Sequence, residues 1–402
     1  MVKILYADVT GDGGGSNVSL QALLSALDRS TYLPVLVFGR MTDGGPWAAE
    51  STHVCPFIGL DNFDFFPAGW NLRWIYQFVQ FVVRFPFDLA RASSLVRKVR
   101  PDIVHLNGGQ LLTFAVAARI SGIPVVWHIR ELVVDNWLGK LQDRMYAALA
   151  DRIIVPSNSV AGRLPCARTK SLVIPNGVVR RQPISSAVQE FRNLHHLHQE
   201  DFVVLLLGRA LSISKGYSFL ADVAEMVDPG LGIKFLLAGR STDADASVLH
   251  RFFRSIYRTG PRAGGEKARI LKRWDTVVRQ GKAAFTGFID PAVAIAASDL
   301  IVCPNLVAEP FGRTVAEARM QGRPVAATNV PAFTELIEHD RTGWLLPPEP
   351  KAWAALLNRL SRDRALVSRI GREASSASGR YDASECGKRA MEVYASMLSR
   401  SA

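Results

Sequence analysis

Short apolar runs alternate with helical patterns along nearly the whole chain, and this rhythm limits the folds open to it. Most of the runs are continuously hydrophobic, as in parallel strands that are buried on both faces. In the first half the strand candidates are 3–8, 34–38, 102–106, 125–128, 152–155 and 171–174. In the second half they are 202–207, 233–238, 283–286, 300–303, 325–327 and 344–346. The pattern predicts an α/β fold built on open, doubly wound parallel sheets.

This alternation of strand and helix patterns stops once, between 179 and 201, where the sequence becomes polar. The segment holds a histidine cluster without the carboxylates or cysteines that would complete a metal site. A chain of 402 residues suits two domains of ordinary size. We therefore predict two Rossmann-like domains that face a cleft, with the ligand-binding loops at the carboxyl ends of the strands. The predicted boundaries are 1–180 for the first domain, 181–200 for a linker, 201–375 for the second domain, and 376–402 for a C-terminal helix that packs back on the first domain.

The termini and the cysteines indicate a cytoplasmic protein. The apolar start runs into glycines without a long hydrophobic region, so we interpret it as a strand and not as a signal peptide. The longest uncharged run of the aromatic region, 74–83, is too short to cross a bilayer. The four cysteines have neither paired nor zinc-type spacing, which suits a reducing compartment. They are Cys55, Cys166, Cys303 and Cys386.

The net charge of +12 is concentrated in a few segments. Between 250 and 282 there are ten Lys and Arg against two acidic residues, an excess of ten minus two, or +8. The stretch 71–83 places apolar residues at helical spacing between Arg73 and Arg84, which fits either a core helix or a helix in a membrane interface. The basic segments fit either an anionic membrane surface, with the protein peripheral at its cytoplasmic face, or solvated helix faces.

The motif with the most chemistry is AEPFGRTVAE, from 308 to 317. A strand ends near Pro304, and a helix is expected to start about Gly312, so the free N–H groups of its first turn can bind phosphate or sugar oxygens. Glu309 precedes this helix and Glu317 lies inside it, where they can accept hydrogen bonds from sugar and ribose hydroxyls. Taken alone, the two glutamates also fit helix-capping charge.

A second motif supplies positive charge. The strand 202–207 runs into Gly208 and Arg209, and Lys215 follows at the start of the next helix. Two cations at a strand end suit a diphosphate whose charge grows as a bond to it breaks. Gly239 and Gly287 end the next two strands and permit close approach of backbone to a ligand.

These motifs, in this order, resemble the retaining glycosyltransferases of GT-B fold family 4, and the resemblance covers essentially the whole chain. It implies that Arg209 and Lys215 hold the donor diphosphate and that Glu317 binds the nucleotide ribose. It also implies that Glu309, with the backbone of Phe311 and Gly312, grips the transferred sugar. Arg313 and Thr314 complete the predicted donor site. The resemblance thus implies that 201–375 is the nucleotide-sugar-binding domain and that 1–180 is the acceptor-binding domain. The spacing from Arg209 to Lys215 is one residue longer than expected, and the step from Gly239 to Phe285 is also long.

The first half carries a second group of candidates. Gly14, Gly15 and Ser16 close a glycine loop that follows the first strand. A dinucleotide fingerprint would want Gly or Ala in place of Ser16, so a nicotinamide cofactor is disfavoured. By the resemblance, this loop lies under the donor phosphates beside the acceptor, and His128 lies near the transferred sugar. We assign to the same side the residues Asn107 and Asn176.

The predicted chemistry is transfer of a sugar from a UDP- or GDP-linked donor to a glycan or lipid-linked acceptor, with retention of configuration. No residue stands out as a covalent nucleophile, so the family's front-face route is expected, without cofactor or metal. Asp243 and Asp245 match a metal-binding Asp-x-Asp pattern but are interpreted as a solvated loop. An isomerase, epimerase or phosphorylase on the same frame remains an alternative. A nucleic-acid-binding protein would explain the basic composition, but no such motif is present and no nucleic acid is expected.

Overall fold

The computed structural model describes residues 1–10, 14–40, 57–59, 72–208, 212–239, 265–287 and 289–399. The chain divides into two compact units. The first unit is formed by 1–179 together with 380–402, and the second by 180–379. Each unit contains one parallel sheet.

The first unit is built on a seven-stranded sheet with the order β3-β2-β1-β4-β5-β6-β7. Its strands are β1 (Val2–Thr10), β2 (Tyr32–Arg40), β3 (Phe57–Gly59), β4 (Ile103–Asn107), β5 (Val125–His128), β6 (Arg152–Val155) and β7 (Ser171–Val173). The order runs outward in one direction from β1 to β3 and in the other from β4, so the switch point lies between β1 and β4. Ligands of such sheets bind beyond the carboxyl ends of the strands at this point.

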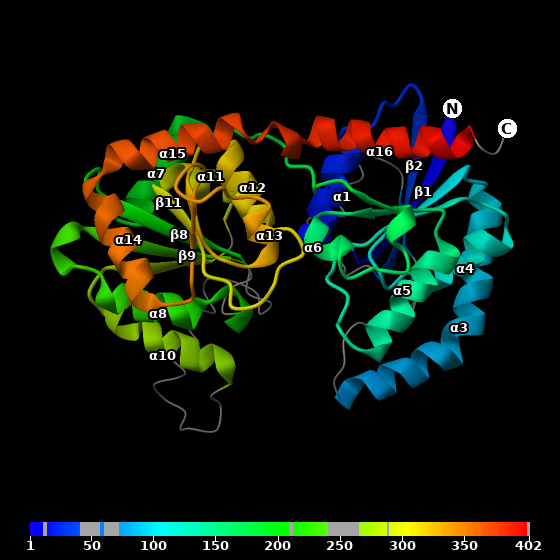
Figure 1. Cartoon of the computed structure of the whole chain (residues 1–402), viewed down its shortest axis with the longest axis horizontal. Helices are drawn as coiled ribbons and strands as arrows, with labels where there is room; N and C mark the ends of the chain where they lie inside the picture. The colour runs from blue at the N-terminus through cyan, green and yellow to red at the C-terminus, as the bar shows by residue number, and fades with distance from the viewer. Residues whose placement is uncertain are drawn as a thin grey trace. The chain divides into compact units, whose positions relative to one another are not determined.

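Helices cover both faces of this sheet. On one face are α1 (Gly15–Ser25) and α16 (Ala383–Leu398), which lie side by side (Figure 1) and share a core with alternate residues of β1, β4 and β5. On the other face are α3 (Leu72–Val99), α4 (Leu112–Ile120) and α5 (Trp137–Leu149). The short α6 (Asn158–Ala161) follows β6. The strands are hydrophobic on both faces because both faces are covered.

The second unit is built on a six-stranded sheet with the order β10-β9-β8-β11-β12-β13. Its strands are β8 (Phe202–Leu207), β9 (Ile233–Ala238), β10 (Ala283–Gly287), β11 (Leu300–Cys303), β12 (Val325–Thr328) and β13 (Trp344–Leu346). The switch point here lies between β8 and β11. The carboxyl ends of these two strands therefore mark the edge where a ligand is expected.

Three helices pack together on one face of the second sheet (Figure 1): α8 (Tyr217–Met226), α10 (Glu266–Arg279) and α14 (Pro350–Arg362). Trp274 of α10 is fully buried in this core and donates its indole N–H to the Tyr217 carbonyl oxygen at 2.9 Å. The remaining helices of the unit are α7 (Ser185–Leu194), α11 (Pro291–Ala297), α12 (Arg313–Met320), α13 (Pro331–Thr334) and α15 (Arg364–Ser376).

The predicted α/β class with two Rossmann-like sheets is confirmed, and each predicted strand is present within one or two residues of its expected bounds. Three elements differ from the sequence prediction. The predicted linker contains α7, which packs on α11 because Arg192 donates to the Ala297 carbonyl oxygen at 2.6 Å. Strand β3 was not predicted, since three residues give no periodic signal. The helix expected over 71–83 continues to Val99 through Pro86.

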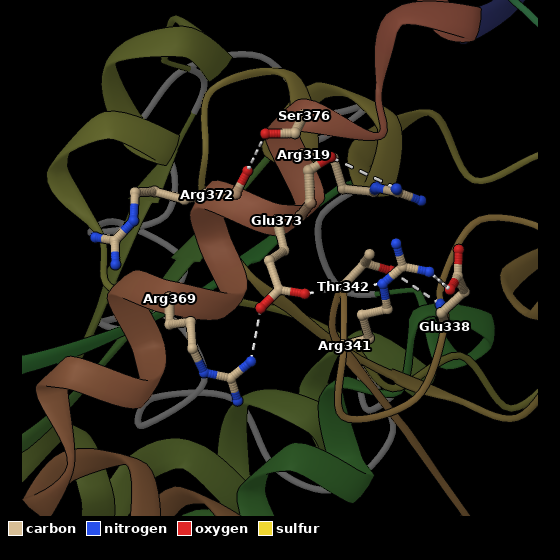
Figure 2. A network of polar contacts seen from close by, with 9 residues as sticks. Arg319, Glu338, Arg341, Thr342, Arg369, Arg372, Glu373 and Ser376 are labelled. Carbon is tan, nitrogen blue, oxygen red and sulfur yellow. Dashed lines mark hydrogen bonds and ion pairs between the residues drawn. The ribbon is translucent and has the colours of Figure 1, made fainter.

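A polar network lies at the C-terminal end of α12. Arg341 lies between Glu338 and Glu373, and Arg369 also pairs with Glu373, at 2.6 Å (Figure 2). Arg319, in the last turn of α12, is buried and donates to the Ala374 carbonyl oxygen at 3.5 Å. The contact of Arg319 joins the last turn of α12 to α15.

No helix in the described part of the chain is long and apolar enough to span a membrane.

Candidate active site

The loops at the switch point of the second sheet bring together one cation, one anion and one amide. Lys215, after β8, forms an ion pair with Glu309, after β11. Asn305 donates its side-chain N–H to the same Glu309 oxygen at 2.5 Å. Lys215 and Glu309 are partly buried and Asn305 is buried, so the group is only partly screened by water.

Close backbone contacts hold the two loops of this group together. Gly216 has φ +74°, and a Cβ built there would overlap the Pro304 carbonyl oxygen. The Leu306 N–H donates to the Ser214 carbonyl oxygen at 3.2 Å. Thr328 of β12 donates to the Asn305 carbonyl oxygen at 2.7 Å. The ends of β8, β11 and β12 therefore form one rigid edge, and only glycine fits at 216.

The first turn of α12 lies next in the chain. Gly312 is its N-cap at φ +94°, and no side chain caps the helix. A Cβ at this position would meet the ring of Phe333 at 2.7 Å. Within the helix, Arg313 pairs with Glu317 at 2.7 Å, and both side chains are about four-fifths buried. The hydroxyl of Thr314 lies 3.5 Å from the Leu207 carbonyl oxygen, which ties this turn to the end of β8.

The other predicted donor residues lie along the same edge or outside the described residues. Phe311 is buried directly before Gly312. Gly239 donates its N–H to the Gly287 carbonyl oxygen at 3.0 Å, so the ends of β9 and β10 are joined as well. Arg209 lies outside the described residues, as do the two aspartates of the Asp-x-Asp pattern at 243 and 245.

This edge combines the groups that a phosphorylated sugar needs. Lys215 can neutralise phosphate charge, while Glu309 and Glu317 can accept hydrogen bonds from hydroxyl groups. Burial raises the pKa of the nearby Cys303 thiol to about 12, so this cysteine is inert at neutral pH. Among the described residues, no group of three or more His, Cys, Asp or Glu is arranged to hold a metal ion.

In the first unit, three polar side chains form a row across the switch point. Asp8, Asn107 and His128 are register partners at the carboxyl ends of β1, β4 and β5. All three are buried. Register partners point to the same face of a sheet, which here is the face covered by α1 and α16.

Hydrogen bonds extend this row in both directions. Asp8 accepts from the side chains of Asn107 at 2.7 Å and Asn17 at 2.9 Å. Asn107 in turn accepts from Arg130 Nε at 2.6 Å, and Arg130 Nη1 donates to the Asn176 side chain. Burial raises the pKa of Asp8 to about 7, although its hydrogen bonds with Asn107 and the Val9 N–H act in the opposite direction.

The glycine loop is attached to this row at its end. Asn17 accepts a hydrogen bond from the Gly14 N–H at 3.0 Å while its amide donates to Asp8. Gly14 and Gly15 are exposed and Ser16 is half-buried, all at the first turn of α1. The predicted residues Asn107 and Asn176 are thus brought together through Arg130, and the loop is connected to them through Asp8.

His128 stands out because it is buried and both of its ring nitrogens are without a hydrogen-bond partner within the described residues. Burial, and then the charge of Arg130, hold its pKa well below the ordinary value, so the ring is neutral at neutral pH. An unmade hydrogen bond at a buried polar atom is costly, which points to a ligand that completes it.

Sequence reasoning missed several residues of these two groups: Asp8, Asn17, His105, Arg130 and Asn305. Three of them follow a simple rule, since Asp8 lies two residues before the end of a strand, and Arg130 and Asn305 lie two residues after the end of one. Polar residues at the ends of buried strands were therefore the signal that could have identified them.

Two family matches agree with this arrangement. The family described as "Glycosyltransferase Family 4" matches residues 13–181, and the family described as "Glycosyl transferases group 1" matches residues 201–363. Each match corresponds to the main part of one unit. The chain is a glycosyltransferase of GT-B family 4.

Characterised relatives and solved structures extend the match. The glycosyltransferase is 28% identical over 306 residues to "Phosphatidyl-myo-inositol mannosyltransferase" of Mycobacterium leprae (strain TN), which covers 73% of each chain. The enzyme of the same name from Mycobacterium tuberculosis (strain CDC 1551 / Oshkosh) is 25% identical over 305 residues, again 73% of each chain. Anabaena Alr3699/HepE in complex with UDP-glucose has the same fold, with a TM-score of 0.77 at 20% identity over 98% of this chain and 100% of the other. Sucrose-phosphate synthase of Thermosynechococcus elongatus gives a TM-score of 0.74 at 19% identity, with both chains fully covered.

Proposed function

We propose that this glycosyltransferase transfers a sugar from a nucleoside-diphosphate sugar, UDP- or GDP-linked, to a lipid-linked or surface-glycan acceptor with retention of configuration. The second unit binds the donor and the first unit binds the acceptor. The observation that carries the proposal is the group of Lys215, Glu309 and Asn305 at the switch point, beside the uncapped first turn of α12.

Charge explains why this group suits a diphosphate leaving group. When the bond from the sugar to the diphosphate breaks, negative charge grows on the phosphate and positive charge on the sugar. Lys215 and the positive end of α12 stabilise the first, and Glu309 stabilises the second. Arg209 adds a second cation on the diphosphate in this scheme. The acceptor hydroxyl attacks from the side that the diphosphate leaves and gives its proton to the leaving phosphate, without a metal or a cofactor.

The proposed acceptor is supported by the mycobacterial relatives, whose printed name places their activity on phosphatidyl-myo-inositol. The nucleotide part of the proposal is supported by the solved neighbour that contains UDP-glucose. His128 supplies a neutral hydrogen-bonding group at the edge of the first sheet, and Arg130 supplies a cation beside it. Together they suit a polar head group that carries hydroxyls and phosphate.

Incubation with nucleotide sugars tests the proposal directly. We expect slow hydrolysis of one UDP- or GDP-linked sugar by the purified protein, and faster loss of the same donor when a lipid-linked acceptor is added. Because the proposed site has no metal, EDTA should leave this rate nearly unchanged. Release of the free nucleotide, measured by chromatography, gives the rate. Loss of activity with EDTA and recovery with Mn²⁺ would contradict the metal-free scheme, and turnover of no nucleotide sugar would contradict the donor class.

The two glutamates should separate into a binding role and a catalytic role. Glu317→Ala should raise the donor Kd, because ribose hydrogen bonds are present in the ground state and the transition state alike. Glu309→Ala should instead lower kcat with a smaller effect on Kd, because its carboxylate acts on a sugar that becomes cationic. Titration calorimetry and hydrolysis kinetics measure the two quantities. If the donor Kd and kcat were unchanged in both variants, the motif AEPFGRTVAE would not be part of the site.

An apolar surface on α3 and α5 supports the peripheral-membrane part of the proposal. Four residues on one side of α3 are more than half exposed: Val79, Val82, Val83 and Phe87. Trp137 and Leu141 of α5 are also exposed. The two helices share a small core formed around Phe81 and Leu138, so they belong to one surface. Apolar side chains of this kind can enter the interface of a bilayer, with cations on the head groups.

Binding to lipid vesicles tests whether this apolar surface enters a bilayer. The wild-type protein should co-sediment with vesicles that contain anionic lipid, and less so at high salt because the charges are screened. The double substitution Val83→Ser and Phe87→Ser should weaken binding about 100-fold, since each buried apolar side chain contributes about 1.5 to 3 kcal/mol. Ile184→Ser is the matched control, because Ile184 is equally exposed but belongs to the second unit. Absence of binding even at low salt would favour a soluble acceptor.

A further inference from the structure

Helix α16 adds a buried tyrosine beside the polar row of the first unit. The Tyr394 hydroxyl accepts from Tyr6 at 3.2 Å and lies 2.9 Å from His105 Nδ1. Tyr6 and His105 are register partners on β1 and β4, two residues before Asp8 and Asn107. Residues two apart on a strand point to the same face. Three buried side chains from β1, β4 and α16 thus form one line next to the site row.

The direction of the hydrogen bonds along this line determines which ring nitrogen of His105 carries the proton. Because Tyr6 donates to the Tyr394 oxygen, the Tyr394 proton is directed to His105 Nδ1, which then acts as the acceptor. Burial, and then the charge of Arg130, lower the pKa of His105 to about 3, so the ring is neutral. A neutral ring that accepts at Nδ1 must carry its proton on Nε2.

The ring of His105 lies beside that of His128, the histidine of the site. The ring centroids of His105 and His128 are 5.5 Å apart, with an angle of 60° between the planes. In the described residues neither His105 Nε2 nor either nitrogen of His128 has a hydrogen-bond partner. A donor placed beside a neutral imidazole favours the tautomer whose lone pair faces it. The remaining nitrogen of His128 then carries the proton.

We propose that Tyr394 is a positioning residue which, acting through His105, sets the ring nitrogen of His128 that carries the proton. The interaction is the electrostatic effect of the His105 N–H on the neighbouring His128 ring, since no hydrogen bond joins the two rings in the described residues. The opposite nitrogen of His128 is then a donor for a substrate oxygen. In the other tautomer it would present a lone pair, which can accept from a hydroxyl group but repels a phosphate oxygen. This last consequence rests on the proposed function, whereas the effect on the tautomer does not.

Nitrogen NMR of protein labelled with ¹⁵N only at histidine tests the proposal without any substrate. The ¹⁵N shifts distinguish protonated from unprotonated ring nitrogens, and spectra of His105→Leu and His128→Gln assign the two rings. In the wild type we expect His105 protonated at Nε2 and His128 in one tautomer. In Tyr394→Phe, which removes one oxygen and keeps the ring, both histidines should become mixtures of tautomers. The His105→Leu protein should show the same change at His128, which covers the case in which Tyr394→Phe does not fold.

Tyr32→Phe is the matched control. Tyr32 also contacts α16, since its hydroxyl donates to the Met391 carbonyl oxygen at 3.4 Å and its ring packs edge-on against Tyr394. It does not belong to the line to His128, so this variant should keep the wild-type tautomers. An unchanged His128 tautomer in Tyr394→Phe and His105→Leu would overturn the proposal, whatever the activity.

Kinetics provide the second readout. With a nucleotide sugar and a lipid-linked acceptor, Tyr394→Phe should lower kcat of transfer about five- to tenfold, the equivalent of one neutral hydrogen bond, with the donor KM unchanged. Tyr32→Phe should keep the wild-type kcat. A changed tautomer with unchanged kcat would restrict the role of Tyr394 to structure and overturn its assignment as a positioning residue for the reaction. If the wild type hydrolyses no donor, the proposed function fails, while the NMR result still decides the tautomer.

Discussion

Replacement of Lys215 by alanine should lower kcat for donor hydrolysis on the order of 100- to 1,000-fold, as for other deletions of a preorganised group that stabilises transition-state charge. Lys215 is the cation that the structure places against Glu309 at the switch point of the second sheet. Its removal leaves the growing charge of the diphosphate without this partner. It also leaves Glu309 with Asn305 as its remaining partner in this group. Single-turnover hydrolysis at saturating donor measures the effect.

Two further variants show whether the loss belongs to this position. Lys215→Arg keeps the charge but changes its geometry, so it should retain part of the activity. Lys234→Ala removes an exposed lysine of the same unit that donates to the Gly281 carbonyl oxygen at 2.7 Å, and kcat should stay at the wild-type value. Equal losses in Lys215→Ala and Lys234→Ala would show that only the overall charge of the unit matters.

Gly216→Ala should destabilise the second unit by about 3 kcal/mol, through a left-handed backbone and an overpacked contact together. Gly216 has φ +74°, and its added Cβ would overlap the Pro304 carbonyl oxygen. Neither strand end can give way easily, because Leu306 and Ser214 also join the two loops. For a unit of this size the thermal midpoint should fall by about 9 °C. Calorimetry of the intact protein measures it.

Gly281 provides the matched control for this substitution. It has φ +66°, close to that of Gly216, but a Cβ built there meets nothing within 4 Å. Gly281→Ala therefore carries only the backbone strain and should cost about 1 kcal/mol. Similar losses in the two variants would mean that the contact with Pro304 relaxes without cost.

The fold was predictable from the sequence because a strand that is buried on both faces must be continuously hydrophobic. Strand 202–207 has this character, as does 233–238 apart from Lys234, and the structure begins and ends both at the same residues. Strand β3 and helix α7 were missed for different reasons. β3 is only three residues long, and α7 lies in a polar segment whose packing on α11 depends on the distant Ala297 carbonyl.

The candidate site was predictable where it depends on local sequence. Lys215 and Glu309 were assigned to the diphosphate and the sugar of one donor, and the structure places their side chains in an ion pair. Asp8, Arg130 and Tyr394 were missed because their roles depend on strand register and on a helix far away in the sequence. No periodicity in the sequence indicates that Asp8 and Asn107 are register partners, or that the Tyr394 hydroxyl contacts His105.

The division of the first unit into two separate stretches of chain has a consequence for synthesis on the ribosome. The second unit is contiguous, from 180 to 379, and can complete its core before α16 emerges. The first unit cannot, because α16 contributes buried side chains to its core, among them Cys386, Val393 and Tyr394. The parallel bridge between Val178 and Asp382 closes this unit only after the whole second unit has been made. The part of the protein that is translated first is therefore the last to reach its native structure.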